Sequence, residues 1–170
     1  GLPINEFDAD KAQQARNTVD LFYTKTLEKI PDLKTREEFI KAYNAELTQA
    51  SNDVTRKKNI INAKNAEIYK NTEIDLRTLI NNKEFSSLGF MDTSQGIKDE
   101  LSRGHIDWKT LKPIVNDYHT IIGTDKEDAQ KIIAENSIYA WKNHMIDYEE
   151  LMENPYIASS PEYIKQINKH

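Results

Sequence analysis

The sequence predicts an all-α protein with an N-terminal long helical hairpin and a C-terminal bundle of short helices. Three observations predict this fold class. Apolar residues recur every three or four positions along several stretches of the chain. No segment alternates apolar and polar residues convincingly over five or more positions with enrichment in β-branched residues. Five Gly and five Pro in 170 residues are few, which favours long regular elements over a loop-rich architecture.

The first helix is expected from about Asp10 to Lys29, with Asp8 or Asp10 as its N-cap. Its apolar residues fall at helical spacing. They are Ala12, Ala15, Val19, Phe22 and Ile30. The segment "IPDLK" (30–34) ends this helix.

A second and longer helix is expected to begin at Thr35, because Thr35 and Glu38 have the spacing of a capping box. It should exceed about 25 residues and lie within 35–71. Its apolar stripe has a heptad-like spacing. The stripe contains Ile40, Tyr43, Leu47, Ala50 and Val54, and continues as Lys57, Ile61, Lys64 and Ile68. Lysine therefore takes every second position after Val54. The two helices should pair as an antiparallel hairpin that packs near Val54 and is looser beyond it, with the stripe facing Val19, Phe22 and Ile30.

The remaining chain predicts shorter helices. Residues 82–92 are rich in turn-forming residues and carry four apolar side chains, so we interpret them as a linker packed on the core. The domains are then 1–81, 82–92 and 93–170. One helix is expected from Asp92 or Thr93 to Gly104, and the next from about Trp108 to Ile122, closed by Gly123. A third should begin with a capping box at Thr124 and Glu127 and continue through Trp141. Two short helices should follow, one after Asp147 and one after Ser160, with Pro161 at its first helical position.

A six-residue motif occurs three times, as "IDLRTL" (74–79), "IDWKTL" (106–111) and "IDYEEL" (146–151). We interpret Asp75, Asp107 and Asp147 as helix N-caps, because Asp accepts the free N–H groups of a first helical turn. The Ile before each Asp and the Leu four residues after it then have the spacing of a hydrophobic staple. The copies are 32 and 40 residues apart, which leaves a degenerate repeat of helix pairs as the alternative.

Charge is distributed unevenly over the chain, whose net charge is −5. Residues 54–70 carry five Lys or Arg residues against the single carboxylate of Glu67. Such a stretch can hold an acidic partner, phosphate, or an acidic part of the same protein. We predict a partner-binding surface there. It comprises Arg56, Lys57, Lys58, Ile61, Lys64 and Ile68.

The sequence favours a soluble, non-enzymatic protein-interaction module, such as an adaptor, an assembly factor or a surface-exposed binding protein. No nucleotide-binding or nucleophile motif occurs, and the chain contains no cysteine. Four scattered histidines suggest no metal site, and no cofactor is expected. No apolar stretch approaches the roughly 20 residues of a membrane-spanning helix. The alternative is a nucleic-acid-associated regulator that uses Arg56–Lys70. A homodimer stays open, as does the compartment, cytoplasmic or exported after loss of a signal peptide.

Overall fold

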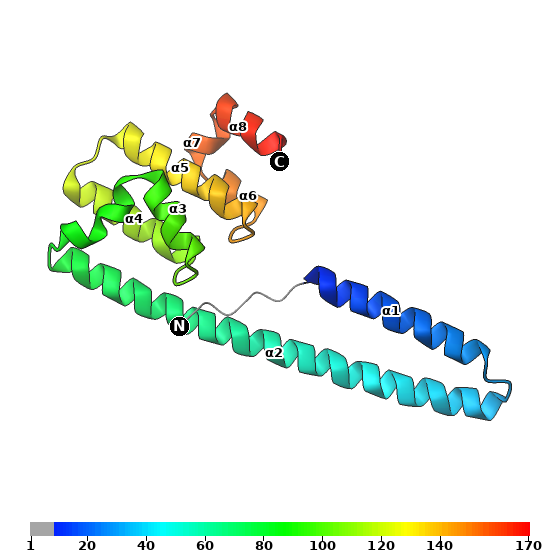
Figure 1. The fold of residues 1–170 in the computed structure, drawn as a ribbon. Helices are drawn as coiled ribbons and strands as arrows, with labels where there is room; N and C mark the ends of the chain where they lie inside the picture. Colours follow the sequence, from blue (N-terminus) through cyan, green and yellow to red (C-terminus); the bar gives the residue numbers. More distant parts are fainter. Residues whose placement is uncertain (1–8) are drawn as a thin grey trace. The chain divides into compact units, whose positions relative to one another are not determined.

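The computed structural model describes residues 9–170 and is all-α (Figure 1). The described residues form nine helices and no strand, which confirms the predicted fold class of a long helical hairpin and a bundle of short helices. The chain forms two compact units that meet between Lys64 and Asn65. We call residues 9–64 the N-terminal unit and residues 65–170 the C-terminal unit.

Two helices build the N-terminal unit. Helix α1 comprises Ala9–Glu28, within one residue of the predicted bounds at each end. Helix α2 comprises Leu33–Asn81 and continues into the C-terminal unit. Within the N-terminal unit the two helices form an antiparallel hairpin joined by a short turn (Figure 1). The predicted caps Asp8 and Asp10, and Ala12 of the predicted stripe, lie outside the residues whose side chains the structure describes.

The start of α2 corrects the predicted capping box. Helix α2 begins at Leu33, so Asp32 precedes it and accepts the backbone N–H of Thr35 at 2.8 Å and the Thr35 hydroxyl at 2.6 Å. These two hydrogen bonds lower the pKa of the Asp32 carboxyl, the hydroxyl contributing more. The cap predicted at Thr35 is therefore wrong, because Thr35 already lies in the first turn.

No Gly or Pro interrupts α2 between Leu33 and Asn81, which explains its 49 residues. The expected length of more than about 25 residues is confirmed, but the predicted limits 35–71 are wrong, because α2 comprises Leu33–Asn81. The helix start predicted at Asp75 is wrong, because Asp75 lies inside α2 and is exposed. Just before it, Thr72 remains helical, with its hydroxyl donating to the carbonyls of Ile68 at 3.0 Å and His105 at 2.9 Å.

The C-terminal unit contains the hydrophobic core. Besides the end of α2 it consists of the 3₁₀ helix η1 (Phe85–Asp92), α3 (Ser94–Ser102), α4 (Trp108–Ile122), α5 (Lys126–Lys142), α6 (Tyr148–Met152), α7 (Pro155–Ala158) and α8 (Pro161–Asn168). One cluster gathers buried residues of α2, η1, α3, α4 and α5, and a second joins α5 to α6, α7 and α8. Trp108 is buried in the first cluster, where its indole N–H donates to the Ser137 hydroxyl at 3.0 Å.

The predicted linker at 82–92 includes η1, whose Leu88 and Met91 are completely buried. The last turns of α2 also belong to this core, because Leu76 and Ile80 are buried in the same cluster. The compact units therefore divide inside α2, and the domain limits 1–81, 82–92 and 93–170 stay a prediction, since compactness alone does not define what folds independently.

Two of the three repeated motifs begin helices. The Asp107 carboxylate accepts the backbone N–H of Thr110 at 3.0 Å and is the N-cap of α4. Asp147 accepts the N–H of Glu150 at 2.8 Å, and Glu150 accepts the N–H of Asp147 at 3.2 Å, so α6 begins with a complete capping box. A residue with positive φ follows the preceding helix before each of these two motifs. It is Gly104, with φ 74°, before Asp107, and His144, with φ 59°, before Asp147.

The other predicted caps are mostly confirmed. Thr93 caps α3, Ser160 caps α8 with Pro161 in its first turn, and Gly123 ends α4 in the left-handed conformation. The capping box predicted at Thr124 and Glu127 is wrong. Asp125 caps α5 instead, by accepting the N–H groups of Glu127 and Asp128.

Candidate protein-interaction surface

The hairpin of the N-terminal unit lacks a core of its own. None of the side chains described between residues 11 and 64 is buried. Seven large apolar side chains are exposed there, namely Val19, Leu21, Phe22, Leu33, Leu47, Val54 and Ile60. Two helices alone cannot enclose an apolar stripe, and exposed apolar residues that gather in one part of a fold are typical of an interaction site.

The two helices contact each other through aromatic rings near the turn. Tyr23 of α1 stacks on Tyr43 of α2 with ring centroids 4.0 Å apart, and on Phe39 at 5.7 Å. The Tyr43 hydroxyl donates to the Asp20 carboxylate at 3.3 Å. Partial burial and then the Asp20 hydrogen bond raise the pKa of Tyr43.

This contact corrects the predicted packing of the hairpin. Val19 is 42% exposed, Phe22 is 69% exposed, and Val54 is 40% exposed, so the close packing predicted near Val54 is wrong. Tyr23, which lies outside the predicted apolar stripe, makes the contact predicted for Phe22. Neighbouring positions on a helix differ by roughly 100° in direction, so this shift of one residue turns Phe22 away from α2.

Helix α2 carries a regular line of apolar residues. Leu33, Ile40, Leu47, Val54 and Ile61 are spaced seven residues apart, and we call these five residues the hairpin stripe. Leu33, Leu47 and Val54 are exposed, and Ile40 and Ile61 are half-buried. A strict seven-residue apolar repeat is the pattern by which one helix packs lengthwise against another.

Helix α1 is too short to cover α2 along the whole N-terminal unit. Its 20 residues span roughly 30 Å, whereas the part of α2 from Leu33 to Lys64 spans roughly 48 Å. Beyond about residue 52, α2 therefore has no α1 beside it. Most of the predicted partner-binding residues lie in this part of α2, which α1 does not cover.

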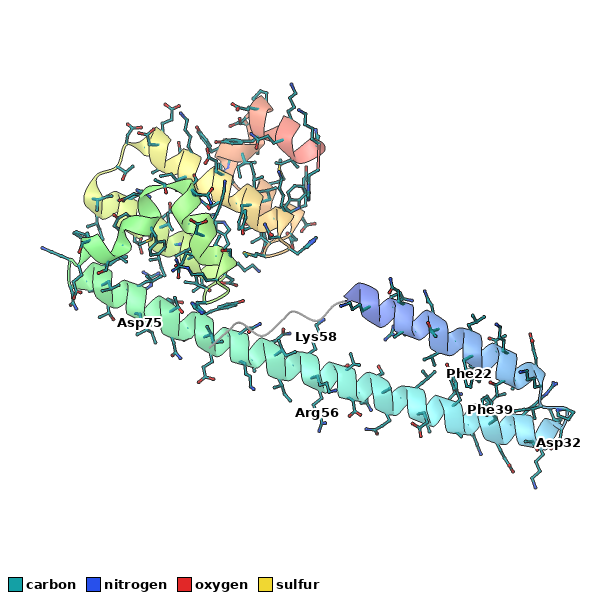
Figure 2. All side chains as sticks on the ribbon, in the orientation of Figure 1. Phe22, Asp32, Phe39, Arg56, Lys58 and Asp75 are labelled. Carbon is teal, nitrogen blue, oxygen red and sulfur yellow. The ribbon has the colours of Figure 1, made fainter. Side chains whose placement is uncertain are left out.

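The structure brings together some of those predicted residues and separates others. Lys57, Ile61 and Lys64 share one face of α2, because they are four and seven residues apart. Arg56 and Lys58 lie on opposite sides of the helix, roughly 200° apart (Figure 2). Ile68 belongs to the C-terminal unit, where it is half-buried.

The four basic side chains of this surface, Arg56, Lys57, Lys58 and Lys64, are exposed. Within residues 9–170, only Arg56 among these four forms an ion pair. Arg56 Nη2 lies 3.9 Å from Asp53 Oδ1, and both side chains are largely exposed, so this pair contributes little to stability. The cations therefore surround the uncovered part of α2 and do not form a single positive face.

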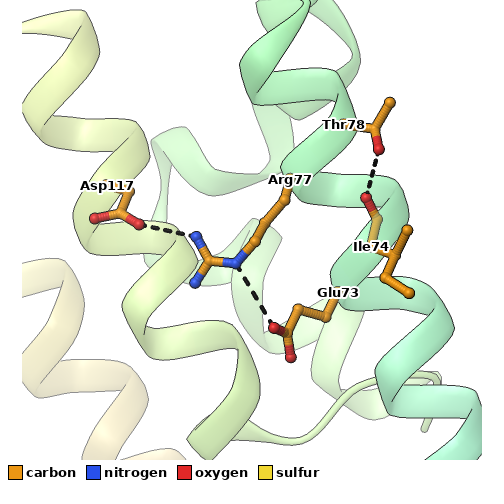
Figure 3. Close-up of polar contacts among 5 residues, drawn as sticks. All are labelled: Glu73, Ile74, Arg77, Thr78 and Asp117. Carbon is orange, nitrogen blue, oxygen red and sulfur yellow. Dashed lines mark hydrogen bonds and ion pairs between the residues drawn. The ribbon is translucent and has the colours of Figure 1, made fainter.

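A second surface feature lies on the C-terminal unit. Arg77 of α2 reaches across to α4, with its Nη1 3.0 Å from Asp117 Oδ2 and its Nε 3.7 Å from Glu73 Oε1 (Figure 3). The shallow hollow beside this ion pair has a volume of about 400 Å³ and is lined by Arg77, Ile80, Asn81, Asp117, Thr120 and Ile121. Its charged groups already pair with one another between α2 and α4.

The buried histidine, His119, makes its polar contacts within the C-terminal unit. His119 is buried, with Nδ1 2.7 Å from the Thr124 hydroxyl and Nε2 2.8 Å from the Met91 carbonyl oxygen. Asp117 pairs with Arg77 instead, so Asp117 and His119 do not converge on one point. Among the described residues, no group of three or more metal-ligating side chains lies together.

Comparison with protein-family models, with curated proteins and with solved structures finds no match to this chain. Within residues 9–170, none of the helices has the length and apolarity that crossing a membrane requires. The fold and its exposed hairpin thus define a class, an all-α protein that combines a cored helical bundle with a coreless helical hairpin.

Proposed function

We propose that this protein is a non-enzymatic helical protein-interaction module, acting as an adaptor, an assembly factor or a surface-exposed binding protein. The hairpin of α1 and residues 33–64 of α2 is its binding element. The supporting observation is that the hairpin exposes seven large apolar side chains and buries none of those described.

The energetics of apolar surface favour this role. Burying apolar area stabilises a complex by about 25 cal/mol per Å², and the hairpin leaves this contribution unused in the isolated chain. A partner that presents an apolar helical face can bury the hairpin stripe lengthwise, as amphipathic helices do in hydrophobic grooves. The exposed Lys57 and Lys64 lie on the same face as Ile61 and favour a partner with carboxylates beside its apolar residues.

A library of displayed amphipathic helical peptides tests this function. Peptides enriched on the whole chain are measured against Leu47→Asp and Val54→Asp, which place a charge in the hairpin stripe. The matched control is Asn52→Asp, which places the same charge on another face of the same helix. We expect the two stripe variants to lose at least about tenfold in affinity and the control to keep it. Peptides that bind all three variants equally contradict the assignment.

The alternative is a nucleic-acid-associated regulator that uses the basic stretch 56–70. The exposure of Arg56, Lys57, Lys58 and Lys64 supports it, since exposed cations bind phosphates by releasing counterions. Their distribution around the helix supports it less, because a nucleic-acid backbone contacts one face. Binding of a generic DNA duplex and a single strand at about 50 mM salt decides between the two. Micromolar affinity that disappears when all four residues are changed to Gln supports the alternative.

A further inference from the structure

The hairpin stripe has the spacing needed to pack against the same stripe of an antiparallel copy of α2. Ile40, Leu47, Val54 and Ile61 are equally spaced, so an antiparallel copy of α2 presents the same apolar spacing to the first. With a two-fold axis near Ser51, Ile40 of one copy lies at the level of Ile61 of the other, and Leu47 lies at the level of Val54. An interface of this isologous kind uses the same patch on both copies.

Charge distinguishes the antiparallel arrangement from the parallel one. Residues 54–64 contain Arg56, Lys57, Lys58 and Lys64 and no carboxylate. Residues 37–53 contain Glu37, Glu38, Glu46 and Asp53 against a single cation, Lys41. Two copies in parallel would place the basic segments side by side, which costs free energy in a low-dielectric contact. Two antiparallel copies place each basic segment at the same level along the axis as the other's acidic segment, with Glu37 at the level of Lys64.

Arg36 and Lys34, the two cations nearest the turn, do not cancel the charge complementarity between the two antiparallel copies. Arg36 is engaged within its own chain, where its Nε donates to the Ile30 carbonyl. Lys34 lies close to the turn, at the level of Glu67 of an antiparallel copy.

The lengths of the helices also suit a second copy. Helix α1 leaves α2 uncovered beyond about residue 52, as its length of roughly 30 Å dictates. In the antiparallel arrangement the turn end of one hairpin lies beside the uncovered part of α2 of the other. Each copy thereby supplies a neighbour along the part of α2 that α1 does not reach, and Ala50 and Ser51, both small, lie where the two helices cross.

We propose that the occupant of the hairpin stripe is a second copy of this chain, paired antiparallel about a two-fold axis near Ser51. The proposal rests on the proposed function of the hairpin as a binding element and specifies its partner.

Sedimentation of the whole chain over a concentration series tests the association. We expect a reversible dimer for the wild type, a monomer for Leu47→Glu, and a dimer for the control Asn52→Glu, which lies off the stripe. A wild type that is monomeric at every concentration overturns the proposal, as does a dimer that Leu47→Glu leaves intact. If the monomer still binds selected helical peptides through the stripe, the proposed function stands and only the second copy is excluded.

The orientation can be tested with cysteines, because the chain contains none. Asn44, Ser51 and Lys58 follow one another at seven-residue spacing on the flank of the hairpin stripe. An antiparallel dimer forms a disulfide with Ser51→Cys alone, and with Asn44→Cys mixed with Lys58→Cys. Asn44→Cys by itself should give no disulfide dimer, because its two copies lie roughly 20 Å apart along the axis. Equal crosslinking of each single variant by itself indicates a parallel dimer and overturns the proposal.

Discussion

Tyr23 and Tyr43 stack with their ring centroids 4.0 Å apart and an angle of 22° between the ring planes. Phe39 lies within reach of both rings, so three aromatic side chains join α1 to α2 near the turn. Farther from the turn, Val19 and Val54 are exposed. The hairpin is thus fixed at its turn end and leaves apolar surface free along its length.

We expect Tyr23→Ala to loosen the hairpin without affecting the core. The stacked pair contributes about 0.5–1.5 kcal/mol beyond its buried area, and α1 has few other contacts with which to replace it. Hydrogen exchange of α1 amides should accelerate, while exchange in α4 stays unchanged. The matched variant Phe22→Ala should change little, because Phe22 is 69% exposed. Equal acceleration in both variants would show that the stacking does not hold α1.

Two leucines of the chain should respond very differently to truncation. Leu111 is completely buried in the core, so Leu111→Ala should lower the free energy of unfolding by about 2–5 kcal/mol. Leu47 is 38% exposed, so Leu47→Ala in the monomer should cost less than about 1 kcal/mol. Urea unfolding at low protein concentration measures both. A loss at Leu47 that equals the loss at Leu111 would mean that the hairpin stripe is buried in solution.

Urea unfolding should also distinguish the three copies of the Ile-Asp motif by the free energy that each Asp contributes. Asp107→Ala and Asp147→Ala each remove a cap and should cost about 1 kcal/mol. Asp75→Ala should be neutral or slightly stabilising, because Asp75 is exposed inside α2 and Ala is the better helix former. A loss of about 1 kcal/mol at Asp75 would show that α2 breaks there in solution.

Helix caps and apolar spacing in the sequence predicted much of the fold, and the three Ile-Asp motifs show the limit of such local signals. A cap signal starts a helix only where the preceding helix ends. Gly104 and His144 provide this end before Asp107 and Asp147, since both adopt positive φ. No such residue precedes Asp75, and Asn71 and Thr72 stay helical. The hexamer alone could not distinguish the three cases.

The hairpin was predictable as an element but not in its register. Leu21, Phe22 and Tyr23 are all apolar or aromatic, so counting apolar residues cannot say which of them faces α2. The stacking of Tyr23 on Tyr43 shows which of the three residues faces α2. Helix α2 also begins at Leu33, two residues before the predicted start. The candidate site was located only in part, because residue spacing cannot show which stripe positions α1 leaves exposed.

At alkaline pH the stability of the folded chain should depend on Tyr118. Tyr118 is buried in the core, and its hydroxyl donates to the Asp92 carboxylate at 2.7 Å. Burial first, and then the hydrogen bond and charge of Asp92, raise the pKa of Tyr118 to about 12, from 10.0 in the unfolded chain. The folded state therefore binds this proton more tightly than the unfolded state does. Its contribution to stability is complete below about pH 10 and is lost as the pH rises through about 12.

Tyr118→Phe isolates this contribution. Lys109, Lys131, Tyr43 and Tyr163 also have raised pKa values, so their contributions fall with pH in the same direction in both proteins. We expect the free energy of unfolding of the wild type to fall more steeply between about pH 10 and pH 12 than that of Tyr118→Phe, because only the wild type has this proton to lose. Urea unfolding at several alkaline pH values measures the difference, and a tyrosinate absorbance titration of the folded protein follows the group directly. Parallel pH profiles for the two proteins would show that Tyr118 ionises in the folded state as readily as in the unfolded one.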